Sequence, residues 1–222
     1  MLYNFINHFY IAENKKSFSG NTKEHLFKDI DANLLAPYED KISWIIIDDS
    51  KMERDAWARE RKQRASERHE LPHRPFVIIN TDVDEIPDPE VICQFQVGKK
   101  WYSAVLKRPL CLDMKFFYYN YHWLVGNWTK GHILPGDDVL AGKYDLNTYR
   151  FNDCGDIDHI PNAGWHGSYF MSVDDIVFKL QSFSHQEVSL TLIRKFVYCI
   201  ILWHTSLLQQ HDIIRSVQQT TT

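Results

Sequence analysis

The sequence lacks the closely spaced cysteine pairs that mark a zinc site or a redox-active dithiol. Its four cysteines, Cys93, Cys111, Cys154 and Cys199, are far apart, and none belongs to a C-x-x-C pair. Two disulfide bonds are compatible with that number, but we expect isolated thiols. Neither structural zinc nor thiol–disulfide chemistry is therefore indicated.

Long apolar runs and an excess of positive charge are also lacking. The run FVYCIILW at 196–203 is too short to span a bilayer. The N-terminal segment MLYNFINHFYIAEN has neither the cationic start nor the apolar stretch of a signal peptide. A formal net charge of −4 offers no basic surface for nucleic acid. We expect a soluble chain with no nucleic-acid partner and no membrane span.

What is present is the composition of an ordered globular protein. Hydrophobic residues make up 44% and aromatic residues 14% of the 222 positions, which is enough for one domain with a sizeable core. Aromatic side chains can bind sugars or bases, although most of them fill cores.

The first ninety residues alternate strand-like and helical patterns. We expect strands at 5–14, 41–50 and 74–87, and the second is a continuous apolar run typical of a strand covered on both faces. The charged segment 52–70 contains no Gly or Pro and predicts a helix. This order of elements indicates an α/β fold with a mostly parallel sheet flanked by helices.

The pattern changes from Trp101 onward. Segment 100–123 is rich in aromatic and β-branched residues and predicts strands, which we expect to be antiparallel. Segment 160–172 predicts a glycine-punctuated loop and a short strand. Segment 172–187 predicts a helix that begins with the Ser-x-x-Asp capping pattern at Ser172.

The segment INTDVDEIPDPE at 79–90 brings Asp82, Asp84 and Glu85 to the end of a predicted strand, before the kink at Pro87. In open α/β sheets this end of a strand is where ligands bind. Alternate residues of an extended segment point the same way, so the two aspartates could share one hard cation that neutralises a diphosphate leaving group. The alternative is a turn of solvated carboxylates; the position before E-I-P favours a functional site.

One face of the predicted helix carries Trp57, Glu60 and Arg64 at i, i+3 and i+7. A buried Glu–Arg pair there could orient the acidic segment or contact a nucleotide phosphate. The alternative is a surface ion pair beside a tryptophan in the core, which composition alone slightly favours.

The segment GWHGSYF places Trp165 and His166 between Gly164 and Gly167. An indole offers a flat apolar face to a sugar ring, and histidine is a common metal ligand. The flanking glycines suggest close approach to a ligand, whereas a single histidine in an aromatic strand is usually a core residue. Both interpretations stay open.

Three further segments are ambiguous from the residues alone. ENKKSFSGNTKE contains a turn at Gly20 followed by Lys23, and it could receive a nucleotide, although the residues alone favour an ordinary strand-to-helix loop. SFSHQE contains Glu187 near the end of a predicted helix. Asn127 begins an N-glycosylation sequon, which has meaning only in a secretory lumen.

Taken in order, these segments resemble glycosyltransferase family 17, which includes the enzyme that adds the bisecting N-acetylglucosamine to the β-mannose of N-glycan cores. The matching pieces are collinear over roughly residues 9 to 188: ENKKSFSGNTKE, AWARERKQR, VIINTDVDEIP, FYYNYHW, NAGWHGSYF and KLQSFSHQE. The resemblance implies a GT-A-like fold with a smaller antiparallel acceptor-side portion. It also implies inverting, metal-dependent transfer from UDP-N-acetylglucosamine to a glycan hydroxyl, with Mn²⁺ or another divalent cation as cofactor.

The resemblance also implies roles for individual residues. Asp84 and Glu85 are expected to be catalytic, and the base that inversion requires is Glu85 first and Glu187 second. The remaining expectations concern binding: the metal by Asp82, Asp84 and His166; the donor by Glu13, Lys23, Arg64, Asp82 and Asp84; the acceptor by Trp165, His166 and Glu187.

Two departures from the family pattern leave other interpretations open. The chain begins at what resembles the second strand of the family, and residues 189–222 form a divergent tail, expected to be helical, beyond a single domain at 1–188. A catalytically inactive homologue that binds a glycan or a protein is therefore the alternative, and a metal-dependent phosphohydrolase ranks third because no dense His/Asp cluster is visible. A eukaryotic form with an N-terminal anchor would work in the Golgi lumen, and any other form in the cytoplasm.

Overall fold

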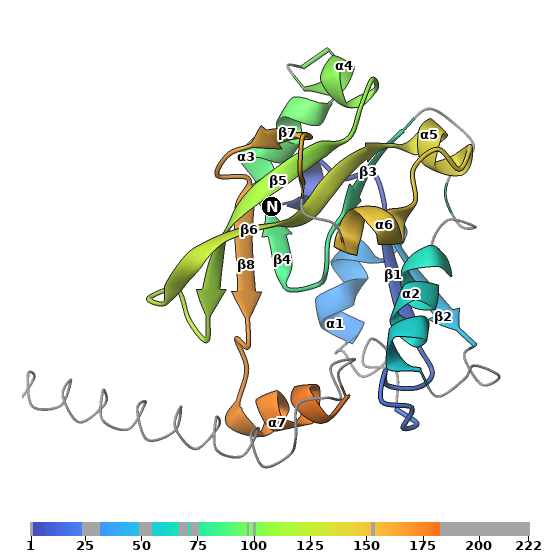
Figure 1. Ribbon diagram of the computed structural model, residues 1–222, viewed down its shortest axis with the longest axis vertical. Helices are drawn as coiled ribbons and strands as arrows, with labels where there is room; N and C mark the ends of the chain where they lie inside the picture. Colours follow the sequence, from blue (N-terminus) through green and yellow to red (C-terminus); the bar gives the residue numbers. More distant parts are fainter. Residues whose placement is uncertain are drawn as a thin grey trace, which may run out of the picture.

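The computed structural model describes residues 2–23, 32–48, 55–66, 71, 76–96, 98–99, 101–151 and 154–182 of the chain (Figure 1). The described part is a mixed α/β fold. Its strands are β1 (Phe9–Asn14), β2 (Ile42–Ile47), β3 (Val77–Asn80), β4 (Glu85–Pro87), β5 (Leu110–Tyr118), β6 (Leu124–Pro135), β7 (Asp158–Ile160) and β8 (Gly164–Ser168). The helices that adjoin the site are α2 (Ala56–Ser66), α6 (Leu146–Phe151) and α7 (Val173–Ser182). The short helices are η1 (Leu2–Asn4), α1 (Ala32–Leu35), η3 (Ala36–Lys41), α3 (Pro89–Ile92), η5 (Cys93–Phe95), α4 (Tyr102–Val105) and α5 (Gly136–Leu140).

The strands form two sheets. β1 and β2 pair in parallel, and the larger sheet has the order β3-β6-β5-β8-β4, with β7 also paired to β5. In that sheet β5 runs parallel to β7 and β8, whereas the β3–β6, β5–β6 and β4–β8 pairs are antiparallel. The α/β class is confirmed, but the sheet is mixed, and the expectation of a mostly parallel sheet is not confirmed.

The core of the large sheet lies along β5 and β6. Leu110, Leu112 and Met114 at alternate positions of β5 are at most 1% exposed, and they pack with Ile133 of β6 in the largest apolar cluster. Alternate residues of a strand project from the same face, so this face of β5 lies against the core. A second cluster, around Leu134, includes partly buried side chains of both β1 and β3, so the two sheets share apolar contacts.

Most of the elements predicted in the first ninety residues are confirmed. β1, β2, β3 and α2 lie inside the predicted segments 5–14, 41–50, 74–87 and 52–70. The prediction for segment 100–123 is only partly right, because its first turn is α4 and not a strand. Trp101 and Val105 are four residues apart and both contact the large core cluster, so a helical turn buries them together.

Helix α7 begins as the capping pattern predicts. The amide N–H of Asp175 donates to the hydroxyl of Ser172 at 3.2 Å, and that hydroxyl in turn donates to the Asp175 carboxylate at 2.5 Å. Across the residues that the structure describes, no helix combines the length and apolar character needed to cross a membrane.

Candidate active site

The acidic loop, residues 81–85, connects β3 to β4 and is bound by two arginines. Arg64 of α2 donates to Asp82 at 2.7 Å and to Glu60 at 3.0 Å, so the buried Glu–Arg pair on α2 does contact the acidic segment. Arg150 of α6 donates to the other oxygen of Asp82 at 2.5 Å. α6 reaches this position because it lies between β6 and α2 (Figure 1), where the Asn80 side chain at the end of β3 donates to the carbonyl of Leu146.

Glu85 is the last residue of this loop and the first of β4, and both of its carboxylate oxygens accept hydrogen bonds. Its side chain has no exposed surface and receives both guanidinium NH₂ groups of Arg150, one of them at 2.8 Å. The indole N–H of Trp128 donates to one carboxylate oxygen at 2.5 Å and the backbone N–H of Asp82 donates to the other at 3.0 Å. Glu85 thus holds Arg150 and the loop together, and it could accept a proton from an acceptor hydroxyl only if this network opened.

The environments of Asp82 and Glu85 shift the pKa values of these two carboxyl groups in opposite directions. Burial opposes the ionisation of Asp82, but Arg150 and Arg64 outweigh it and lower the pKa of that carboxyl. Burial dominates at Glu85 and raises its pKa despite Arg150, with the neighbouring Asp82 charge acting in the same direction. The loop therefore holds one firmly ionised carboxylate beside one that accepts a proton more readily.

Asp84 faces a different set of groups. Lys179 of α7 donates to one carboxylate oxygen at 3.1 Å, and Nε2 of His166 lies 3.6 Å from the other. Burial raises the pKa of Asp84, but the imidazole and the ammonium group outweigh it and lower that pKa to about 2. The side chain is 25% exposed, so Asp84 is an ionised carboxylate that a ligand can reach.

His166 lies in a row of aligned residues across three strands. It is opposite Glu85 of β4 and opposite Phe116 of β5, and its ring stacks on Phe116 with centroids 4.7 Å apart. The Trp128 ring lies against it at 4.1 Å. Its Nδ1 is buried and has no hydrogen-bond partner among the described residues, and its Nε2 faces Asp84. His166 is therefore both a packed aromatic residue and a potential ligand.

The glycines around Trp165 and His166 have a structural explanation. Gly164 has a φ of +149°, and a Cβ there would overlap the carbonyl oxygen of Ile86 and lie 2.8 Å from the Cα of Pro87. At Gly167 the ring of Phe170 lies 3.2 Å from the position of a Cβ. β4 and an aromatic ring occupy the positions that side chains would take here, so packing within the chain accounts for both glycines.

The other predicted site residues that the structure describes lie in two places. Glu13 at the end of β1 pairs with Lys23 at 3.8 Å, beyond the turn at Gly20 that the Arg59 guanidinium covers. Trp165 follows the alternation of β8 and projects from the face opposite His166, so these two predicted acceptor residues are not brought together. Glu187 lies outside the described residues.

Sequence reasoning did not find three residues of this site: Trp128, Arg150 and Lys179. Arg150 is 6% exposed and lies between Tyr149 and Phe151, and a charged residue between aromatics on a short helix is only a weak signal of a buried ion pair. Trp128 is the middle residue of the sequon that begins at Asn127, and nothing in that pattern indicates a contact with the acidic loop. Lys179 lies on an amphipathic helix, where a lysine ordinarily faces solvent.

The cysteine expectation is corrected in part. Cys111 of β5 and Cys154 form a disulfide bond, with their Cα atoms 5.9 Å apart; Cys93 is free and Cys199 lies outside the described residues. Cys111, Cys154 and His159 are the group of three potential metal ligands found in the described part of the chain. Because both sulfurs are in the disulfide, this group offers no thiolate to a metal.

The acidic loop fits a divalent cation in part. Asp84 and His166 place a carboxylate oxygen and an imidazole nitrogen within reach of one ion. Asp82 directs its oxygens at Arg64 and Arg150, so the three-ligand set of Asp82, Asp84 and His166 is not assembled in this arrangement.

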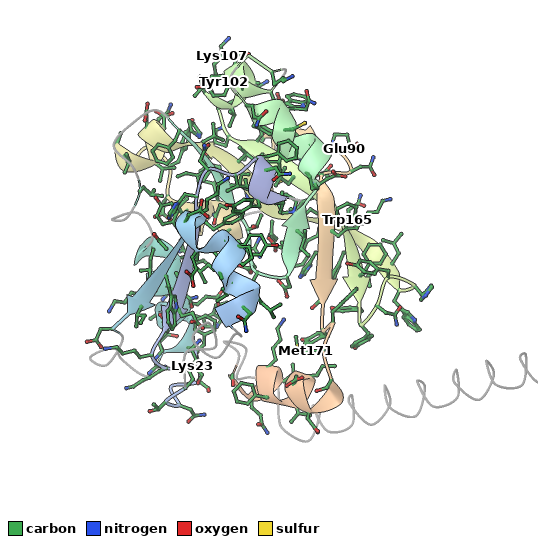
Figure 2. All side chains as sticks on the ribbon, turned by 180° about the vertical axis from the view of Figure 1, so that it is seen from behind. Lys23, Glu90, Tyr102, Lys107, Trp165 and Met171 are labelled. Carbon is green, nitrogen blue, oxygen red and sulfur yellow. A yellow bond between two sulfur atoms is a disulfide. The ribbon has the colours of Figure 1, made fainter. Side chains whose placement is uncertain are left out.

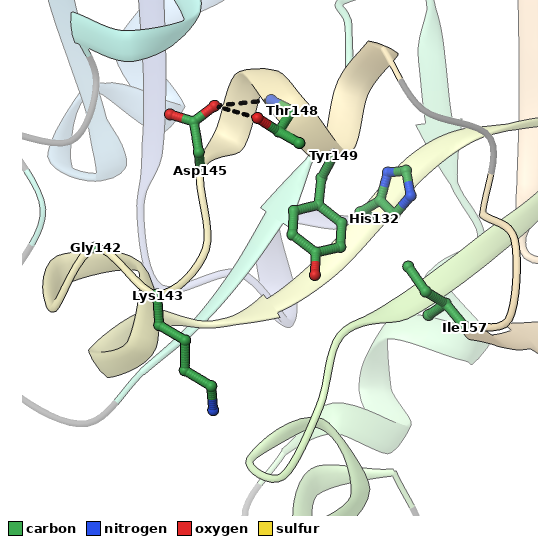
Figure 3. A pocket seen from close by; sticks show the side chains of 7 residues that line it. All are labelled: His132, Gly142, Lys143, Asp145, Thr148, Tyr149 and Ile157. Atoms are coloured by element: carbon green, nitrogen blue, oxygen red, sulfur yellow. Dashed lines mark hydrogen bonds between the residues drawn. The ribbon is translucent and has the colours of Figure 1, made fainter.

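A separate cavity of about 420 Å³ opens on the other side of α6 (Figure 3). Tyr149 and His132 face it, whereas the adjacent Arg150 reaches the acidic loop. Its lining contains none of the predicted site residues: His132, Gly142, Lys143, Asp145, Thr148, Tyr149 and Ile157.

Comparison with known proteins identifies a family for this chain. Residues 1–195 match the model of a protein family described as glycosyltransferase family 17. Neither the curated proteins nor the solved structures yielded a match. A family match over most of the chain supports glycosyl transfer, with a sugar donor and a glycan acceptor. The chain belongs to glycosyltransferase family 17.

Proposed function

We propose that the protein transfers N-acetylglucosamine from UDP-N-acetylglucosamine to a mannose or other sugar hydroxyl of a glycan, with inversion at the anomeric carbon. Family membership supports the reaction class. The observation that carries the proposal is the acidic loop, where the reachable, ionised Asp84 lies beside His166 and Lys179.

In this proposal Asp84 and His166 would hold the divalent cation. When bound, the cation would offset the negative charge that develops on the diphosphate leaving group. Lys179 and Arg64 add positive charge at the same loop, so they too can stabilise a diphosphate. Arg150 contacts both Glu85 and Asp82 and keeps Asp82 in place.

Inversion requires a base on the face of the sugar opposite the leaving group. Glu85 was our first candidate, and its raised pKa suits a base, but its contacts with Arg150 and Trp128 fit a positioning residue better. Glu187 is the second candidate for the catalytic base. Turnover and donor titration of Glu85→Gln together distinguish these roles, because a lost base removes turnover alone, whereas lost positioning also weakens donor binding.

The proposal is tested by calorimetric titration of UDP-N-acetylglucosamine with and without Mn²⁺. We expect Mn²⁺-dependent binding to the wild type and at least tenfold weaker binding to Asp84→Ala. Asp113→Ala is a matched control, since Asp113 is a partly exposed aspartate on β5 paired to His159. Absence of donor binding by a well-folded wild type would contradict the proposal.

The second candidate function is a catalytically inactive homologue that binds a glycan or a protein. The observation that favours it is the neutralisation of Asp82 and Glu85 by arginines of this chain, which leaves Asp84 as the loop carboxylate open to a cation. Binding of a glycan without binding of the donor would favour this candidate.

A further inference from the structure

An aromatic strip leads away from the acidic loop along one face of the large sheet. Trp128 contacts His166, His166 stacks on Phe116, and Phe116 contacts Tyr118 with ring centroids 4.8 Å apart. Phe116 and Tyr118 are alternate residues of β5 and therefore project from the same face. The strip connects the donor side of the site to the ends of β5 and β8.

The strip ends in a cluster of three tyrosines. Tyr118, Tyr119 and Tyr169 stack pairwise, with ring centroids 5.5 to 6.1 Å apart and interplanar angles between 24° and 29°. The backbone N–H of Tyr119 donates to the carbonyl of Ser168 at 3.0 Å, which joins the end of β5 to the end of β8. Three nearly parallel rings thus form one aromatic surface at this end of the sheet.

The backbone at two of these tyrosines is strained. Tyr119 has a φ of 64° and Tyr169 a φ of 60°, and residues other than glycine rarely adopt positive φ values. Such strain persists where the surroundings hold it, and it concentrates at functional sites. Tyr119 and Tyr169 pack against Ile176 of α7, so the cluster has a rigid support on one side.

The tyrosine hydroxyls remain available to a ligand. In the described part of the chain, none of the hydroxyls of Tyr118, Tyr119 and Tyr169 has a hydrogen-bond partner, and none is among the buried polar atoms that lack one. Burial raises the pKa of Tyr119 and of Tyr169, so both phenols stay protonated and can donate as well as accept. Flat apolar faces bordered by hydroxyl groups suit a hexopyranose.

Lys179 connects this surface to the acidic loop. Its ammonium group lies 5.1 Å from the centre of the Tyr169 ring and donates to Asp84 at 3.1 Å. A sugar on the tyrosines would therefore lie next to the carboxylate assigned to the donor side. A purely structural cluster would not need free hydroxyls in this position.

We propose that Tyr118, Tyr119 and Tyr169 form the binding surface for the acceptor saccharide, a neutral hexopyranose such as a mannose unit of a glycan. The assignment of this sugar as the acceptor rests on the proposed function. The saccharide binding itself does not, because it follows from the stacked rings and their hydroxyls.

The test measures binding of a mannose-containing N-glycan core oligosaccharide by saturation-transfer NMR and, where turnover occurs, separate KM values for donor and acceptor. We expect Tyr119→Ala to weaken oligosaccharide binding by roughly tenfold, the equivalent of one lost stacking contact. Tyr169→Phe keeps the ring and removes the hydroxyl, so it should weaken binding less. The donor KM should not change, whereas a variant that merely loosened the fold would change both KM values.

Tyr102→Ala is the matched control. Tyr102 is a half-buried tyrosine on α4, at the opposite end of the molecule from Met171, which follows Tyr169 by two residues (Figure 2). Unchanged oligosaccharide binding by Tyr119→Ala, or no binding by the wild type, would overturn the inference even if the donor binds. Oligosaccharide binding that depends on Tyr119 in a protein that does not bind the donor would overturn the proposed function and support the inference.

Discussion

At the scale of single residues, the ion pair between Arg150 and Glu85 dominates the candidate site. Arg150→Met should lower the free energy of unfolding by about 3–5 kcal/mol, because it leaves the Glu85 carboxylate buried without its charged partner. The measurement is urea unfolding followed by circular dichroism.

Two further variants serve as comparisons for Arg150→Met. Arg108→Met removes an ion pair with Asp158 whose side chains are 60% and 47% exposed, so its effect should stay below about 1 kcal/mol. The double variant Arg150→Met/Glu85→Leu should recover part of the loss, because the Glu85 carboxylate is no longer buried without a partner and Asp82 keeps its ion pair with Arg64. Equal stability of Arg150→Met and Arg108→Met would contradict the buried pair.

His132 predicts how stability depends on pH. The side chain is 1% exposed, and burial lowers its pKa to about 4 from an ordinary value of 6.5. The unfolded chain therefore binds a proton below about pH 6.5, which the folded chain does not bind until about pH 4. The contribution of His132 to the free energy of unfolding should be fully present above pH 6.5. It should fall by about 3 kcal/mol as the pH drops from 6.5 to 4.

The contribution of His132 appears as a difference between variants. His132→Gln should unfold with a weaker dependence on pH between 6.5 and 4 than the wild type. His122 is exposed in the β5–β6 connection, so His122→Gln should keep the wild-type profile. Parallel pH profiles for wild type and His132→Gln would contradict a neutral, buried His132, which donates from Nδ1 to the Lys130 carbonyl at 2.9 Å.

At the scale of elements, the pairing of β4 with β8 depends on Gly164. Gly164→Ala should destabilise the protein by at least about 2 kcal/mol, because the φ of +149° disfavours a side chain and the methyl group would overlap the β4 backbone. Since β4 begins at Glu85, the substitution should also weaken donor binding. Thermal unfolding and donor titration measure the two effects.

Gly126 provides the comparison for Gly164. It lies on β6 with nothing within 4 Å of a Cβ and without a positive φ, so Gly126→Ala should leave stability within about 0.5 kcal/mol of the wild type. A tolerated alanine at position 164 would mean that β4 does not approach β8 this closely.

Helices and strands could be predicted from the sequence where the residue pattern fits only one type of secondary structure. β1, β2, α2 and α7 follow from apolar runs, continuous charge and a capping residue, all of which act within a few residues. In segment 100–123 the strand β5 is confirmed, but the first turn is helical, because the same aromatic residues suit a strand and a helical turn. Strand direction was predicted less well, since pairing of β3 with β6 rather than with β2 depends on contacts distant in sequence.

At the scale of the whole molecule, the acidic loop was predictable, but its partners were not. Asp82, Asp84 and Glu85 are adjacent in the sequence, and their position after a strand indicates a site. Arg150 and Lys179 come from helices 65 and 95 residues away, so only the folded chain brings them to these carboxylates. The pairing of Cys111 with Cys154 has the same origin, because no local pattern identifies it.

The disulfide bond should stabilise the whole molecule. It closes a loop with a sequence separation of 43 between Cys111 and Cys154. Because the closed loop lowers the conformational entropy of the unfolded chain, the bond should raise the free energy of unfolding by about 4 kcal/mol.

Because Cys154 follows Arg150 by four residues, the bond also ties the segment carrying Arg150 to β5. The variant Cys111→Ala/Cys154→Ala should therefore unfold at lower urea concentration and bind the donor more weakly. Cys93→Ala, at the free cysteine, should do neither. A reducing agent should bring the wild type close to the double variant and leave the double variant unchanged. Wild-type stability that is the same with and without reductant would show that the Cys111–Cys154 bond contributes nothing, and the position of Arg150 would then rest on its ion pairs with Asp82 and Glu85 and on the packing of α6.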